Sequence, residues 1–245
     1  MSKAVGVLGG MGPETTLDFF AKVLRQTGAS SDQEHLRLLI DNNPGVPDRN
    51  AALTGQGQSP GPVLAQMARG LQASGADFLV MVCNTAHAFQ EDILNATTLP
   101  FVSLIEETRD AVLRLQPECQ TIGLLATSTC LGAGLYQSAF APHHVVTLAL
   151  EGSALAQFMA LLYRIKAGDT GPEVRAEMRD LALQLVDSGA EVLVAGCTEV
   201  PLVLGAQDVP VPLVNSTDVL VERTLQYARG LAPLPKRRVE TVVLP

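Results

Sequence analysis

Two cysteines lie at matching positions of two similar segments. Cys83 ends the apolar run of SGADFLVMVCNT, which begins at residue 74, and Cys197 ends the run of SGAEVLVAGCTE, which begins at residue 188. In each segment we expect a buried strand to end at the cysteine and a helix to begin there. The unpaired amides and the dipole of a helix N-terminus stabilise a thiolate, so both thiols are expected to have a lowered pKa.

The pairing of the two cysteines, more than either one alone, indicates chemistry. A single cysteine after an apolar strand is usually a small buried hydrophobic residue. If two similar lobes face each other, however, two such thiols point into one cleft from opposite sides. One thiolate can then remove a proton from one face of a carbon while the other thiol delivers a proton to the opposite face, which inverts the stereocentre.

The remaining cysteines and histidines do not form a recognisable metal site. There is no CxxC or HxxxH motif, and His143 and His144 are adjacent instead of spaced along a helix face. We therefore expect no metal ion and interpret these two histidines as solvated loop residues. Cys119, in the polar PECQ segment, matches no motif and is expected to be incidental.

The elements that must position the two thiols follow an alternating pattern. Short runs rich in Val, Leu and Ile alternate with longer amphipathic stretches such as TLDFFAKVLRQ and EVRAEMRDLALQLVDSG. The alternation predicts βαβ units around mainly parallel sheets, whose strands are continuously apolar because both faces are buried. The expected strands are AVGVLGG, LRLLIDN, DFLVMVC, FVSL, TIGLLA, VVTLAL, EVLVAGC and VPLVN.

An internal duplication accounts for this pattern. Besides the two cysteine segments, AVGVLGG at 4–10 resembles TIGLLAT at 121–127, and LPFVSLIEET at 99–108 resembles VPVPLVNSTD at 209–218. The three matches keep their order, at offsets of 117, 114 and 110 residues. The sequence thus predicts an α/β protein of two pseudo-symmetric lobes, with the active site in the cleft between them. We place lobe one at 1–98 plus 214–245 and lobe two at 99–213.

Composition excludes several classes of protein. The 245 residues include 17 basic and 25 acidic side chains, and the net charge of -8 would repel a phosphate backbone. The N-terminal KAVGVLGGMGP is too short and glycine-rich for a secretion signal, and no apolar run approaches the ~18 residues that span a bilayer. Four cysteines are too few for a disulfide scaffold. We expect a cytoplasmic protein that binds neither nucleic acid nor membrane.

Six segments spread along the chain resemble the PLP-independent aspartate/glutamate racemases. They are GVLGGMGPETT near the start, NNPGVPDRN at 42–50, CNTAHAF at 83–89, IGLLAT at 122–127, YRIKAG at 163–168 and GCTEVPLV at 196–203. The resemblance implies a homodimeric isomerase that needs no cofactor and acts on an acidic amino acid. It also implies two acid–base residues, Cys83 and Cys197, and a substrate-binding set of Arg49, the Asn84–Thr85–Ala86 turn and Lys166.

The residue types fit these roles. An amino-acid α-proton is very weakly acidic, so an enzyme without a cofactor must stabilise the charge that develops on the carboxylate. Arg49 offers a bidentate guanidinium for a carboxylate. Lys166, near the end of the expected helix ALAQFMALLYRIKAG, could reach the distal carboxylate, although a lysine there also suits the helix dipole alone. The neutral donors are expected at Asn84, Thr85, Thr127 and Thr198.

Three positions qualify the resemblance. Cys130 stands where many relatives of the ATxGT pattern have a hydroxyl, and we interpret it as a packed small side chain. Glu199 follows Cys197–Thr198 where the cell-wall glutamate racemases usually have histidine, which favours aspartate over glutamate and makes this carboxylate a candidate for tuning the thiol. His87, four residues after Cys83, could tune that thiol or be a structural histidine bonded to a backbone carbonyl.

Several different functions are compatible with the sequence. The glycine-rich GGMGPETT lacks the lysine of a P-loop and the third glycine of a dinucleotide fingerprint, so its glycines are expected to let the backbone approach a small substrate. A two-lobed amino-acid-binding protein would suit the duplication but leaves the paired thiols unexplained. Broad-specificity racemisation, maleate isomerisation and arylmalonate decarboxylation are also compatible with the same fold.

Overall fold

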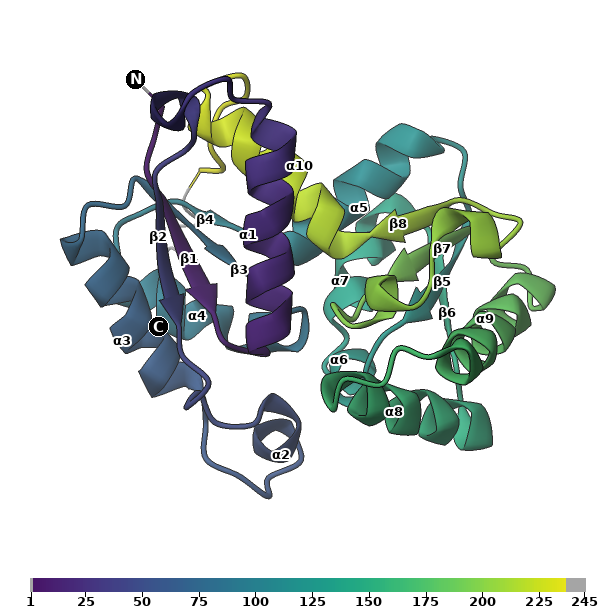
Figure 1. Cartoon of the computed structure of the whole chain (residues 1–245). Helices are drawn as coiled ribbons and strands as arrows, with labels where there is room; N and C mark the ends of the chain where they lie inside the picture. Colours follow the sequence, from purple (N-terminus) through teal and green to yellow (C-terminus); the bar gives the residue numbers. More distant parts are fainter. Residues whose placement is uncertain (1, 237–245) are drawn as a thin grey trace.

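The computed structural model describes residues 2–236 and contains two four-stranded parallel sheets with helices on their faces (Figure 1). The first sheet has the order β2 (Leu38–Asn42), β1 (Val5–Gly9), β3 (Phe78–Met81) and β4 (Phe101–Val102). The second has the order β6 (Val146–Ala149), β5 (Thr121–Leu125), β7 (Val192–Ala195) and β8 (Leu213–Asn215). All eight expected strands are present, and the predicted α/β fold with two similar lobes is confirmed.

The helices begin and end where the sequence supplies the chemistry for it. In α1 (Pro13–Thr27), proline occupies the first turn, where its missing N–H costs nothing, and Gly28 ends the helix in the left-handed conformation. The other α-helices are α2 (Arg49–Leu53), α3 (Gly61–Ala73), α4 (Gln90–Ala96), α5 (Leu104–Leu115), α6 (Ser128–Gly132), α7 (Leu135–Phe140), α8 (Gly152–Lys166), α9 (Pro172–Asp187) and α10 (Ser216–Ala228). Within residues 2–236, no helix has the length and apolar character needed to cross a membrane.

The two sheets share the packing of their central strands as well as their strand order. A Cβ atom built on Gly6 of β1 would lie 2.6 Å from a methyl group of Leu79 and 3.0 Å from Cβ of Ala76. One built on Gly123 of β5 would lie 2.7 Å from the same atom of Leu193 and 3.0 Å from Cβ of Ala190. Only glycine fits these close approaches. The repeated contact supports the internal duplication independently of the sequence matches.

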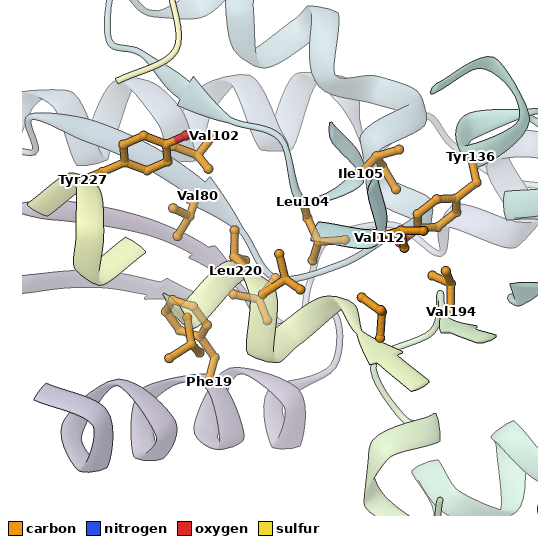
Figure 2. Packing of buried hydrophobic residues seen from close by; sticks show 14 of the residues in the cluster. Phe19, Val80, Val102, Leu104, Ile105, Val112, Tyr136, Val194, Leu220 and Tyr227 are labelled. Carbon is orange, nitrogen blue, oxygen red and sulfur yellow. The ribbon is translucent and has the colours of Figure 1, made fainter. Parts of the chain in front are cut away.

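One hydrophobic core joins the lobes. It includes Phe19 and Val80 from the first half and Tyr136 and Val194 from the second, with α5 and α10 between them (Figure 2). The helix α5 follows β4 of the first sheet and leads toward the second sheet, whereas α10 follows β8 and runs back toward α1 (Figure 1). The lobe boundaries proposed from the sequence stay predictions, and their last nine residues, 237–245, lie outside the described residues.

An ion pair with a buried carboxylate connects α5 to α10. Arg223 Nε lies 2.6 Å from Glu107 Oε2, and the hydroxyl of Tyr227 donates to the other oxygen of Glu107 at 2.5 Å. Phe78 of the first sheet packs edge-on against the Tyr227 ring, with 6.3 Å between centroids. This cluster holds the far end of α10 against the first lobe.

Candidate active site

The carboxyl ends of β3 and β7 contribute to one pocket between the lobes. The pocket encloses about 360 Å³, including its mouth. It brings together nine of the eleven site residues expected from the sequence: Arg49, Cys83, Asn84, Thr85, Thr127, Lys166, Cys197, Thr198 and Glu199. Parallel strands of two similar sheets therefore deliver both cysteines to the same space, as the repeat predicts.

Cys83 is nearly buried and has a cationic neighbour. Its exposed fraction is 7%, so the side chain meets the outside only through the pocket. Burial raises the pKa of the Cys83 thiol, while the charge of Arg49 and a hydrogen bond from the backbone amide of Ala86 act in the opposite direction. Ala86 is itself buried and is not among the lining residues, so its contribution is made through its backbone.

Cys197 has the same exposed fraction of 7% but an anionic neighbour. Its thiol donates a hydrogen bond to Oε2 of Glu199 at 2.9 Å, and the hydroxyl of Thr198 donates to the same oxygen at 3.2 Å. Burial raises the pKa of Cys197 well above its usual range, and the carboxylate of Glu199 raises it further. In this arrangement Cys197 is a thiol.

The expectation that both thiols have a lowered pKa is wrong. The segments directly after the cysteines are short 3-10 helices, η2 (Thr85–Phe89) and η4 (Val200–Leu202), and only η2 runs on into an α-helix, α4. The predicted polar caps are also absent there, because neither Asn84 nor Glu199 makes a side-chain capping hydrogen bond. Desolvation dominates because both sulfurs lie at buried strand ends.

Arg49 and Lys166 approach the pocket from different elements. Arg49 is the first residue of α2, and its Nη1 donates to the carbonyls of Val46 and Pro47 at 3.1 and 3.0 Å, which fix the guanidinium. Lys166 is the last residue of α8, and its Nζ lies 3.8 Å from Oε1 of Glu199. Burial lowers the pKa of Lys166, but nearby negative charge, above all that of the Glu199 carboxylate, leaves it above its ordinary value, so the ammonium is charged.

Hydrogen bonds of hydroxyl groups connect the two lobes beside the pocket. The hydroxyls of Thr85 and Thr127 lie 3.0 Å apart, and Thr127 also accepts from the amide of Cys130 as the N-cap of α6. On the α2 side, the hydroxyl of Thr129 donates to the side-chain oxygen of Asn50. The residue beside Arg49 is thus attached to the second lobe.

His87 is a structural residue. Its Nε2 accepts a hydrogen bond from the amide of Leu104 at 3.0 Å, so its Nδ1 carries the proton and donates to the carbonyl of Cys83 at 2.8 Å. Burial lowers the pKa of His87 to about 4. The neutral ring joins the end of β3 to the start of α5 and lines a separate cavity, not the pocket of the cysteines. Of the two interpretations of this histidine, the geometry favours the carbonyl-bonded one.

The other two cysteines do not line the pocket. Cys130 is 1% exposed within the main core, and burial raises its pKa to about 12. Cys119 is buried near the start of β5, with its thiol 3.5 Å from the carbonyl of Thr121. Neither belongs to the pocket lining, which agrees with the packed role expected for Cys130 and the incidental role expected for Cys119.

Three lining residues were not anticipated. Met11 follows the glycine-rich turn after β1, and Asp48 and Asn50 flank Arg49. The sequence could have indicated Asp48 and Asn50, because both are polar and adjoin the expected arginine in GVPDRN. The turn itself differs from expectation: Gly10 has φ +90°, and a Cβ atom there would lie 2.4 Å from the backbone of Asn43, so this glycine accommodates the protein's own loop.

An open groove adjoins the pocket. It is lined by the first half of α1, including Leu17, and by the turn after α8, and it shares Lys166 and Glu199 with the pocket of the cysteines. The groove gives the lysine end of the site more room than the cysteine end. Among residues 2–236, no group of three or more His, Cys, Asp or Glu side chains is placed to hold a metal ion.

Comparison with known proteins gives a consistent result. The family model described as Asp/Glu/Hydantoin racemase matches residues 8–224. The broad specificity amino-acid racemase RacX of Bacillus subtilis (strain 168) is 24% identical over 229 residues, which cover 90% of this chain and 96% of that protein. Picrophilus torridus aspartate racemase has a TM-score of 0.79 at 24% identity, covering 96% of both chains. Glutamate racemase isoform RacE1 from Bacillus anthracis has a TM-score of 0.65 at 18% identity, covering 94% of this chain and 83% of that one.

Proposed function

The chain belongs to the Asp/Glu/hydantoin racemase family, and from this premise we propose that it interconverts L- and D-aspartate without a cofactor. The observation that carries the proposal is the shared pocket: two cysteines from equivalent strand ends, with an arginine and a lysine beside them. Thiols that approach a carbon from two sides suit proton transfer with inversion better than any one-base reaction.

The proposed reaction moves one proton at each thiol. A thiolate takes the α-proton, so a C–H bond breaks, an S–H bond forms, and the electron pair is delocalised into the substrate carboxylate. The opposite thiol then gives its proton to the other face of the carbon, which restores a C–H bond with inverted configuration. Arg49 and the backbone amides at the strand ends stabilise the charge on the carboxylate between the two steps. The two sulfurs have then exchanged protonation states.

Glu199 and Lys166 are proposed to set the conditions for these steps. The carboxylate of Glu199 holds the proton on Cys197 by a direct hydrogen bond, so this thiol is the ready donor. We propose that the charged Lys166 binds the distal carboxylate of an acidic substrate. Aspartate is preferred over glutamate because Glu199 occupies the position where the cell-wall glutamate racemases usually have histidine.

Racemisation of a broader range of amino acids is a second candidate. The open groove beside Lys166 and Glu199 leaves space for side chains longer than that of aspartate. RacX, the full-length relative with the broad-specificity name, matches the chain over nearly its whole length. Decarboxylation and simple amino-acid binding fit the pocket less well, because a decarboxylase of this fold needs only one cysteine and a binding protein needs none.

Incubation with amino acids in heavy water tests the proposal. The protein is incubated with L-aspartate in heavy water, α-proton exchange is followed by NMR, and D-aspartate is measured by chiral chromatography. Parallel incubations use glutamate and a set of uncharged amino acids. Formation of D-aspartate with incorporation of deuterium at the α-carbon is expected. Absence of both exchange and inversion for aspartate and glutamate alike would refute the proposed activity.

Replacing Lys166 tests the acidic-substrate assignment. The Lys166→Met variant is expected to raise KM for aspartate about ten- to a hundredfold, because a charge-assisted contact with the distal carboxylate is lost. The activity toward uncharged amino acids should change much less. Arg179→Met, an exposed basic residue on α9, is the matched control and should behave as the unmodified protein. An equal effect of Lys166→Met on charged and uncharged substrates would contradict the assignment.

A further inference from the structure

Both polar atoms of the Asn84 side chain are occupied within the protein. The hydroxyl of Tyr136 donates to Oδ1 at 2.6 Å, and Nδ2 donates to the hydroxyl of Ser216 at 3.2 Å. All three residues are buried, with exposed fractions of 3%, 1% and 0% for Asn84, Tyr136 and Ser216. The oxygen and one N–H of this carboxamide are thus bound within the protein, which fixes the side chain of the residue that follows Cys83.

The two partners of Asn84 reach the strand that ends at the other cysteine. Ser216, the first residue of α10, donates its own proton to the carbonyl of Ala195 at 2.8 Å. The Tyr136 ring lies against the backbone of Gly196, where a Cβ atom would approach one ring carbon to 3.0 Å. Ala195 and Gly196 directly precede Cys197. Two bridges therefore run from the residue after Cys83 to the two residues before Cys197.

The directions of the hydrogen bonds are fixed. Because the single hydroxyl proton of Ser216 is used at Ala195, Ser216 can only accept from the Asn84 amide, which leaves Oδ1 of Asn84 as the acceptor for Tyr136. Burial raises the pKa of Tyr136 far above its ordinary value, so its hydroxyl keeps the proton that it donates. Figure 2 shows the Tyr136 side chain of α7 within the core that joins the lobes, which also contains Val194 of β7.

We propose that Tyr136 and Ser216 are positioning residues that set the separation and facing of the Cys83 and Cys197 thiols through the side chain of Asn84. Neither residue lines the catalytic pocket, so their effect is exerted through the strand ends. Two-base inversion is sensitive to this separation, because the donor thiol must lie within reach of the carbon as soon as the other thiol has taken the proton. The proposal rests on the racemase function proposed above.

The variants Tyr136→Phe and Ser216→Ala each remove one bridge and leave the other. We expect each to lower kcat about tenfold with little change in KM, and to raise the ratio of α-proton exchange to inversion severalfold. The ratio rises because a carbanion that the displaced donor does not reach in time is reprotonated on its original face. Tyr227→Phe is the matched control: it removes a buried tyrosine hydroxyl bound to Glu107, far along α10, and should lower stability without changing the ratio.

A second measurement does not depend on activity. A short reagent that alkylates two thiols in turn, such as dibromobimane, is applied to the folded proteins, and the Cys83–Cys197 cross-link is quantified by peptide mass mapping. The cross-linked fraction should fall severalfold in Tyr136→Phe and Ser216→Ala but not in Tyr227→Phe. If the unmodified protein racemises no amino acid, the proposed function fails, and the cross-linking result alone decides the positioning role. Unchanged cross-linking and an unchanged exchange-to-inversion ratio in both variants would overturn the inference.

Discussion

The strand ends at Cys83 and Cys197 have equivalent backbone positions, but the groups around the two thiols differ in charge. Cys83 has the guanidinium of Arg49 and the amide of Ala86 as its stabilising neighbours. Cys197 instead donates to the carboxylate of Glu199. His87 supports the backbone behind Cys83, whereas the residue at the same distance from Cys197 is Pro201, which has no ring nitrogen to offer.

This difference shows how a duplicated fold can serve an asymmetric chemical step. Two-base proton transfer needs one thiolate and one thiol at a time, and identical surroundings would give both sulfurs the same tendency to ionise. The repeated strands, including the glycine contacts at Gly6 and Gly123, bring both cysteines to one pocket. The side chains that are not repeated then assign the proton to Cys197.

Removing either thiol should have the largest effect. Cys83→Ala and Cys197→Ala are each expected to lose racemisation by about a thousandfold or more, because one of the two proton transfers is lost. Each variant should still exchange the α-proton of one enantiomer, and the two variants should prefer opposite enantiomers. The measurement is NMR of separate L- and D-aspartate incubations in heavy water.

The same incubations can contradict the roles assigned to the two thiols. Cys130→Ala, which removes a buried cysteine outside the pocket, serves as the control and should keep the activity of the unmodified protein. Near-full racemisation by either Cys83→Ala or Cys197→Ala would mean that the two thiols are not an acid–base pair. Exchange of the same enantiomer by both variants would mean that the thiols do not approach from opposite faces.

Neutralising Glu199 should make the surroundings of the Cys83 and Cys197 thiols more alike. The carboxylate raises the pKa of Cys197, so Glu199→Gln is expected to lower that pKa and to move the alkylation of Cys197 by iodoacetamide to lower pH. Cys83 should shift in the same direction by less, since Glu199 is a smaller influence there. We expect racemisation to fall about tenfold because Cys197 then loses its proton more often, and less of the protein has the one thiolate and one thiol that two-base transfer needs.

Glu191→Gln is the matched control for this change. Glu191 lies in the same lobe, where it accepts hydrogen bonds from Gln116 and from the amide of Gln120 and is not part of the pocket. Alkylation rates of each cysteine are read as a function of pH by peptide mass mapping. A Cys197 profile in Glu199→Gln that coincides with that of Glu191→Gln would show that the carboxylate does not control the thiol.

Much of the fold could be predicted because its signals are local or repeated. Apolar runs of strand length mark all eight strands, and the offset of 114 residues between Cys83 and Cys197 reflects the equivalence of β3 and β7. The length of the helical segment after each cysteine could not be predicted in this way. The polar residues there suit a helix cap, but they make contacts across the pocket, and each segment begins as a short 3-10 helix, which continues into α4 only after Cys83.

The site was predictable in its membership and less so in its energetics. Residue types and the family resemblance identified most of the pocket, yet the pKa of a thiol depends on burial and on neighbours from distant segments. Glu199 was a candidate from its position, but its hydrogen bond to Cys197 depends on a side-chain conformation that no pattern encodes. Tyr136 and Ser216 were not expected as partners of Asn84, because they lie 52 and 132 residues away.

The smallest expected effect is on stability, and it comes from His87, which holds the backbone carbonyl of Cys83. Burial lowers the pKa of His87 to about 4 from 6.5, so protonation favours the unfolded state. The stability that the neutral ring provides is complete above pH 6.5 and is lost as the pH falls toward 4. By linkage the loss reaches at most about 3 kcal/mol of unfolding free energy.

His87→Gln should flatten this part of the pH profile while lowering stability at pH 7, because the bridge between the Cys83 carbonyl and the Leu104 amide is disturbed. Urea unfolding at a series of pH values measures both effects. His143→Gln, at an exposed position, should keep the slope of the unmodified protein. If His87→Gln kept that slope as well, the pKa of His87 would not differ between the folded and unfolded states, and burial of the neutral ring would not account for the pH dependence of stability.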